Sequence, residues 1–217
     1  MSTDALRDFL AKARGSLDRR AAANEDVVEL WGLAALRGRL IELSARGATA
    51  TLTTAIDLVL EAQLASEPVA WIMLQTGSFY PPDVADSGVD LAALVVIRVP
   101  GTNATGAARA AERVLRSGAF GLVVLDLGAH AGDISMAHQG RLVSLAQAHD
   151  AAVVCLTEKT ADTASLGSLV SLRAEALRAR AAAPQKDEFD LTVRALKDKR
   201  RGPGWTKKIK ARGPAGF

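Results

Sequence analysis

The stretch Gly38–Ala65, GRLIELSARGATATLTTAIDLVLEAQLA, decides the fold of this 217-residue chain. It predicts an apolar strand at Leu40–Leu43, then a tight polar loop, then an amphipathic helix. The helix would place four large aliphatic side chains on one face, at Leu52, Ile56, Leu60 and Leu64. Strand, loop and helix in this order are the layout of a phosphate-binding loop, which indicates an α/β scaffold of the nucleotide-binding type.

The residues that would hold a phosphate are absent from that loop. In the frame of the G-x-x-x-x-G-K-[ST] pattern, alanines stand for both glycines, at Ala45 and Ala50. Thr51 replaces the lysine, and Leu52 replaces the hydroxyl residue that binds magnesium. Cβ atoms obstruct the positive-φ turns that aim N–H groups at a phosphate, and no ammonium or hydroxyl reaches phosphate or metal. We therefore expect no catalysis, no nucleotide and no other cofactor.

Composition limits the class of protein. The chain is 49% hydrophobic, which is typical of a globular protein, and no apolar run approaches the ~18 residues of a membrane span. Asp4 precedes any apolar stretch, so we expect no secretory signal and a cytoplasmic protein. Cys155 is the single cysteine, and His130, His138 and His149 are dispersed, so no metal site is predicted. Aromatics make up only 4%, which argues against a stacking platform for single-stranded nucleic acid.

Downstream of the loop, apolar strands alternate with helices. The further strands are predicted at Val69–Leu74, Leu94–Val99, Phe120–Leu125 and Ala151–Leu156. Helices are predicted at Ala104–Ser117, capped by Asn103 and closed by Gly118, and near Ser135–His149. The prolines of Phe79–Gly88 predict a loop there. This alternation indicates a mostly parallel sheet covered by helices on both faces.

The two ends of the chain do not follow this alternation of strands and helices. Leu6, Phe9 and Leu10 recur at helical spacing, and this N-terminal helix (1–23) would pack on its own core or on a neighbouring molecule. After a core spanning 24–198, we expect a flexible basic tail at 199–217. Two long antiparallel strands, at Ser168–Arg178 and Phe189–Lys197, would end the core, although the first also suits a helix.

The basic residues concentrate near the C-terminus. From Leu191 onward, nine of the 27 Lys and Arg residues accompany one of the 24 acids, Asp198, so this part carries +8 and the rest −5. The candidate binding residues are Lys197, Lys199, Arg200, Arg201, Trp205, Lys207, Lys208 and Lys210. Such a tail could neutralise phosphates of nonspecific DNA, dock on a protein with Trp205 as an anchor, or serve only as a solvated terminus.

The order of elements resembles the RecA recombinase core. Five segments carry the resemblance: Gly38–Leu43, Leu60–Gln63, Ser87–Leu91 with Leu94–Val96, Arg113–Ala119 with Leu122–Asp126, and Ser165–Arg173. They resemble the strand before that family's phosphate loop, the end of the next helix, its next segment, its Walker B region, and the strand after its second DNA loop. The resemblance covers about residues 4–205.

The positions at which this chain differs from the RecA pattern determine which function we expect. Of the residues that carry ATP hydrolysis in the RecA family, only Asp126 remains. The segment Leu74–Gly77 lacks the glutamate that activates water in that family. The two DNA loops are also short. A shortened, nucleotide-free relative resembles the ImuA family, accessory proteins of the ImuA–ImuB error-prone polymerase cassette, whose members are also labelled SulA-like division inhibitors.

That resemblance implies a pseudo-ATPase that acts in SOS-induced translesion mutagenesis through protein contacts. Its implied partners are an ImuB-like polymerase homologue, RecA and an error-prone replicative-type polymerase. The alternatives are a DNA-binding regulator of recombination that uses the basic tail, and a SulA-like inhibitor of cell division. No membrane partner is expected.

Overall fold

The computed structural model describes residues 30–47, 49–75, 77, 79–129, 134–180 and 188–212. The chain divides into two compact units, Met1–Leu30 and Trp31–Phe217. The predicted N-terminal helix with Leu6, Phe9 and Leu10 lies outside the described residues.

The second unit is an α/β fold built on one mixed sheet. Its elements are α2 (Leu33–Leu36), β1 (Arg39–Ser44), α3 (Thr51–Leu64), β2 (Val69–Leu74), α4 (Pro81–Asp86), η1 (Leu91–Ala93), β3 (Leu94–Val99), α5 (Ala104–Arg116), β4 (Leu122–Gly128), α6 (Met136–Ala148), β5 (Ala152–Thr157), β6 (Leu172–Arg180), β7 (Glu188–Asp198) and β8 (Thr206–Arg212). The described strands pair in the order β3-β2-β4-β5-β1-β6-β7-β8. Pairing is parallel from β3 to β6 and antiparallel from β6 to β8. The predicted fold class is confirmed, and the arrangement is consistent with a RecA-like fold.

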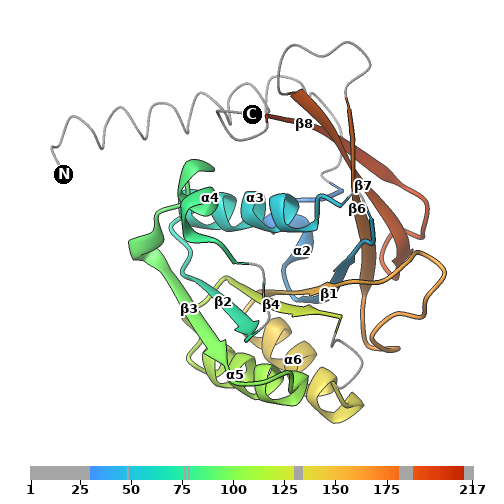
Figure 1. Ribbon diagram of the computed structural model, residues 1–217. Coiled ribbons are helices and arrows are strands. Elements are labelled where there is room, and N and C mark those ends of the chain that lie inside the picture. The colour runs from blue at the N-terminus through green and yellow to red at the C-terminus, as the bar shows by residue number, and fades with distance from the viewer. Residues whose placement is uncertain are drawn as a thin grey trace, which may run out of the picture. The chain divides into compact units, whose positions relative to one another are not determined.

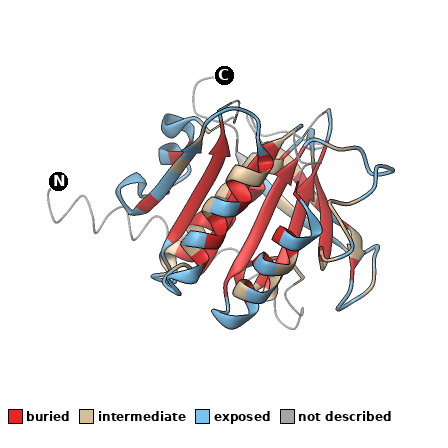
Figure 2. Ribbon diagram, turned by 90° about the horizontal axis from the view of Figure 1, so that it is seen from below, coloured by how far each residue is buried: buried red, intermediate tan, exposed pale blue. Residues whose placement is uncertain are grey.

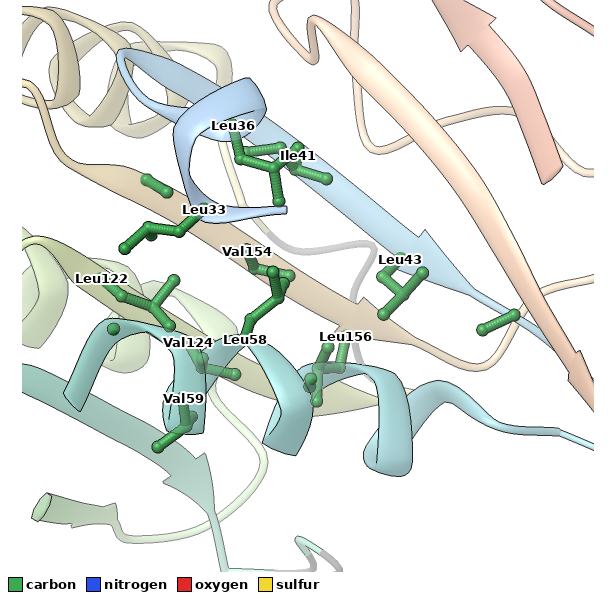
Figure 3. Packing of buried hydrophobic residues seen from close by; sticks show 14 of the residues in the cluster. Leu33, Leu36, Ile41, Leu43, Leu58, Val59, Leu122, Val124, Val154 and Leu156 are labelled. Carbon is green, nitrogen blue, oxygen red and sulfur yellow. The ribbon is translucent and has the colours of Figure 1, made fainter. Parts of the chain in front are cut away.

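Helices cover both faces of the parallel part of the sheet (Figure 1). Strands β1, β2 and β5 are buried at every residue, as Figure 2 shows by the red strands behind α5 and α6. Two hydrophobic clusters result, one under α2, α3 and α4 and one under α5 and α6. In the first, Leu58 and Val59 of α3 pack toward Val124 and Val154 of the sheet (Figure 3). Burial of such continuous apolar strands is the main stabilising contribution.

Local capping signals predicted the helix ends well. The Asn103 side chain accepts hydrogen bonds from the N–H groups of Thr105 and Gly106, at 2.9 and 3.3 Å. Gly118 follows α5 with φ +69°, which a side chain would strain. Ser135 is the N-cap of α6, and its hydroxyl accepts from His138 N–H at 3.5 Å. The start and end predicted for α5 are confirmed.

The structure differs from the sequence-based expectations in three local details. Within the predicted loop Phe79–Gly88, Pro81 and Pro82 begin α4, because a first helical turn needs neither their N–H groups nor a different φ. The fully buried face of α3 has smaller residues than predicted: Thr54, Ala55, Leu58, Val59 and Ala62. Of the predicted face, Leu52, Ile56 and Leu60 are half-buried and pack against the same cluster. Strand β3 is apolar like the central strands, but it lies at the sheet edge, where Val95 and Val96 are 44% and 37% exposed.

The basic tail was also predicted incorrectly. Thr206–Arg212 is not flexible but forms β8, which pairs with β7 over seven residues, so three antiparallel strands end the fold instead of two. Ile209 and Ala211 pack against the cluster under α3, while Lys208 and Lys210 between and beside them are exposed. The alternative strand or helix at Ser168–Arg178 is resolved as strand β6.

Candidate functional site

The loop between β1 and α3 is held against β6. The Ala50 N–H donates to the Ala176 carbonyl at 3.0 Å, and Thr49 forms an antiparallel bridge with Leu177. Ala45 and Ala50 are buried, whereas Gly47 is exposed with φ +88° and has open space around it. The one positive-φ turn described in this loop therefore faces solvent, and its flanks are part of the protein's own sheet.

The first N–H groups of α3 are already occupied. Thr51 N–H donates to the Thr49 hydroxyl at 3.0 Å, and that hydroxyl also lies 2.6 Å from the Thr51 hydroxyl. A helix N-terminus binds an anion through N–H groups that lack partners. Here Ala50 and Thr51 have protein acceptors, so the loop lacks both the side chains and these two backbone donors of a phosphate site.

Asp126 is placed within β4 and is 5% exposed. Its surroundings are tightly packed: a Cβ added at Gly77 would lie 3.0 Å from Asp126 Oδ2 and 2.7 Å from Met73 Cε. Gly77 therefore permits a close approach of the backbone to this carboxylate. Asp126 is therefore buried next to Gly77, which follows β2 in the chain.

A buried charge cluster at Glu42 was missed by the sequence reasoning. Glu42, in β1, has no exposed surface, and its Oε1 lies 3.0 Å from Lys159 Nζ and 3.0 Å from the Thr157 hydroxyl. Its Oε2 accepts from Leu166 N–H at 2.8 Å, and Arg173 Nε lies 3.9 Å away. The signal that could have identified it was Glu42 between the apolar residues Ile41 and Leu43 of a strand that was expected to be buried.

Arg173 extends this cluster into the loop between β5 and β6. Its guanidinium donates to the carbonyls of Thr160, at 2.8 Å, and Thr163, and Nε donates to the Ser44 hydroxyl at 3.4 Å. The family resemblance places a second DNA loop here. In this chain the corresponding segment is tied at both ends to β1 and β6, and Glu42 and Arg173 are saturated with internal partners.

The basic candidates divide into engaged and exposed side chains. Internal carbonyls accept from four of them: Lys197 donates to Gly167 at 3.3 Å, Lys199 to Ser168 at 2.5 Å, Arg200 to Arg37 at 3.3 Å and Lys207 to Trp31 at 2.6 Å. Burial lowers the pKa of Lys197, and the nearby Lys199 charge lowers it further. Arg201 is exposed at the turn. The side chains of Lys208 and Lys210 are exposed on β8 and make no hydrogen bond or ion pair with another described residue.

Trp205 also serves the fold. It packs against the cluster under α3, and its indole N–H donates to Asp198 Oδ2 at 3.0 Å. Asp198 Oδ1 pairs with Arg39 at 2.6 Å, with both side chains at most 3% exposed. The structure thus does not gather the predicted tail residues into one surface, because most of them fasten β7 and β8 to the sheet.

Comparison with known proteins adds no assignment: the sequence matches no protein-family model and no curated protein. No helix in the described residues is long and apolar enough to cross a membrane. Those residues also hold no group of three or more His, Cys, Asp or Glu side chains placed to bind a metal.

Proposed function

We propose that this chain is a non-catalytic accessory protein with a RecA-like fold that works through contacts with other proteins in SOS-induced translesion DNA synthesis. The proposed partners are an ImuB-like polymerase homologue, RecA and an error-prone replicative-type polymerase. The sequence resemblance to the ImuA family supplies the biological role. The fold class and the geometry of the β1–α3 loop are compatible with it.

One observation carries the non-catalytic part of the proposal. The Ala50 N–H donates to Ala176, and the Thr51 N–H donates to Thr49. A bound phosphate would have to displace these two acceptors without help from a lysine or a glycine turn. This adds a backbone argument to the missing side chains, so a pseudo-ATPase is favoured on two grounds.

Calorimetric titration with ATP and Mg²⁺ tests this part. We expect no detectable heat of binding at protein concentrations suited to micromolar affinity. A micromolar Kd would overturn the pseudo-ATPase proposal, whatever partners the protein has.

Binding of the purified chain to ImuB-like protein and to RecA tests the partner part. The full chain is compared with a variant that lacks residues 1–20, because Leu6, Phe9 and Leu10 are the proposed contacts. We expect loss of at least one partner on deletion. Failure of the full chain to bind either protein refutes this part, and unchanged affinities after deletion refute the role of the helix.

A DNA-binding regulator remains a second candidate because Lys208 and Lys210 are exposed on β8. The structure changes how this is tested. Truncation after residue 198 would remove a strand and uncover the half-buried Ile209 contact, so lost DNA binding could reflect lost structure. Lys208→Gln with Lys210→Gln removes two charges and keeps β8. Equal DNA binding by wild type and this variant would exclude β8 as the contact.

A further inference from the structure

The two helical layers of the sheet carry opposite charge. Helices α3 and α4 contain four acids and no Lys or Arg: Asp57, Glu61, Asp83 and Asp86. Helices α5 and α6 contain four arginines and a single acid: Arg109, Arg113, Arg116 and Arg141, with Glu112. Figure 2 views the molecule from the side of α5 and α6 and shows the exposed outer surfaces of both helices. Charged residues that served only solubility would be mixed on both layers. The separation of acids and arginines onto opposite layers therefore points to another role.

The arginines of α5 form one exposed row. Arg109, Arg113 and Arg116 are spaced by four and three residues, so they project from the same side of the helix. Together with Glu112 they line an open hollow of about 230 Å³. From Arg109 to Arg116 the row spans about 10 Å along the helix axis.

The single acid of this layer is neutralised by its neighbours. Glu112 Oε1 lies 2.5 Å from His138 Nδ1 and 3.0 Å from Arg141 Nε, and its side chain is 10% exposed. Burial tends to raise the pKa of Glu112, but the hydrogen bonds from His138 and Arg141 outweigh it and the pKa is lowered. Arg141 itself stays 43% exposed. The outer surface therefore presents guanidinium groups rather than alternating charges.

Helix stabilisation explains part of this row. Arg113 and Arg116 lie in the last turn of α5, where cations interact favourably with the helix dipole. That effect falls off within one turn, so it does not account for Arg109 or for Arg141 on the neighbouring helix. The exclusive use of arginine also favours a ligand, because the planar guanidinium binds phosphate oxygens in pairs.

We propose that the α5–α6 arginine surface (Arg109, Arg113, Arg116 and Arg141) contacts the phosphate backbone of nucleic acid without reading its bases. Neither helix contains Phe, Tyr or Trp, and the one imidazole, at His138 of α6, is buried, so no ring on these helices is exposed for a base to stack on. Duplex DNA carries one negative charge per ~1.7 Å of axis, so a 10 Å row meets several phosphates. This surface is separate from β8 and goes beyond the protein-docking function proposed above.

Fluorescence anisotropy with labelled single strands and duplexes of about 30 nucleotides tests the proposal across roughly 50 to 200 mM salt. The test variant is R109Q/R113Q/R116Q in the full chain. The matched control, R46Q/R98Q/R178Q, also loses three exposed arginines. Arg98 lies on the α3 side of β3, because its neighbours Ile97 and Val99 pack on the α5 side.

We expect the test variant to bind about tenfold or more weakly at low salt, with the slope of log K against log salt smaller by roughly two to three. The control variant loses the same number of charges but none of the proposed phosphate contacts. It should bind DNA within about threefold of wild type, and its slope of log K against log salt should change only as far as the lower net charge requires. Circular dichroism melting verifies that both variants fold. Whether single strands or duplexes bind better identifies the form of nucleic acid that is contacted.

Three results would overturn the proposal. The first is equal weakening in the test and control variants, and the second is full loss of DNA binding in K208Q/K210Q with none in R109Q/R113Q/R116Q. The third is binding of poly-glutamate of matched charge as tightly as DNA, which would assign the surface to an acidic protein segment. Partner binding is measured without DNA, so failure here is distinguishable from failure of the accessory-protein proposal.

Discussion

Asp198, the last residue of β7, pairs with Arg39, the first residue of β1, across the intervening strand β6. Their closest atoms are 2.6 Å apart, and the carboxylate also accepts from Trp205 N–H and from the Arg200 backbone at 2.9 Å. Arg39 further donates to Ser171. The only acid in the basic C-terminal segment is therefore the buried partner that joins the antiparallel strands to the parallel sheet.

Removing that carboxylate should destabilise the fold strongly. Asp198→Asn leaves the Arg39 charge buried without a counter-ion, which costs about 3 kcal/mol or more. Urea denaturation measures the free energy of unfolding. The matched control is Asp150→Asn, which alters an ion pair of 3.7 Å at a carboxylate that is 74% exposed and should change stability by less than about 1 kcal/mol. Similar losses for the two variants would contradict the role given to Asp198.

The same carboxylate should make stability depend on acid pH. Burial would raise the pKa of Asp198, but the hydrogen bonds from Arg200, Trp205 and Arg39 outweigh it, and its pKa is lowered. A lowered folded-state pKa means that the stabilisation is present above the unfolded value near pH 4 and is lost as pH falls through the folded value. Denaturation curves at several pH values should show the gap between wild type and Asp198→Asn closing below about pH 4. A constant gap would refute this.

Thr49 should stabilise the start of α3. Its hydroxyl accepts from Thr51 N–H, so Thr49→Ala removes an acceptor at the helix N-terminus and should cost about 1 kcal/mol. Thr53→Ala, at an exposed position of the same helix, is the control. It should leave stability unchanged or raise it slightly, because alanine favours helix. Thermal or urea unfolding compares the two.

Glu42 should hold the β5–β6 loop in place. Glu42→Gln removes the charge that pairs with Lys159 while keeping the shape of the side chain, so hydrogen exchange at Leu166 and its neighbours should accelerate. The loss of global stability should be about 3 kcal/mol. Glu158→Gln, an exposed position in the same loop, should leave exchange unchanged. Equal exchange in both variants would show that Glu42 does not restrain the loop.

Restoring the motif should not restore the site. The variant A45G/A50G/T51K/L52S recreates the phosphate-loop pattern, yet Ala176 of β6 still accepts from the backbone of residue 50 and Thr49 still pairs with Leu177. We expect no ATP binding by calorimetry. Micromolar binding by this variant would mean that the missing side chains alone prevent nucleotide binding.

Local chemistry was sufficient to predict several elements of this protein. Val69–Leu74 and Leu94–Val99 are strands with the predicted bounds, and Asn103 caps α5 as expected. Continuous apolar runs and short-range caps act within a few residues, so they can be recognised without the rest of the chain. The loss of the phosphate-loop residues was equally visible.

Contacts between distant segments decided the rest. Thr206–Arg212 has the composition of a solvated tail, but β7 offers an unpaired edge and the core offers a site for Ile209, so it becomes a strand. Trp205 and Lys207, which the sequence offered only as candidate ligand contacts, also make internal hydrogen bonds to residues distant or separate in the chain. The charge difference between the helical layers also emerges only when α5 and α6 are placed together on one face. Three properties depend on residues that are far apart in sequence: which strand edge is free to pair, which side chains are buried, and how charge sums over a surface. Only the folded chain brings those residues together.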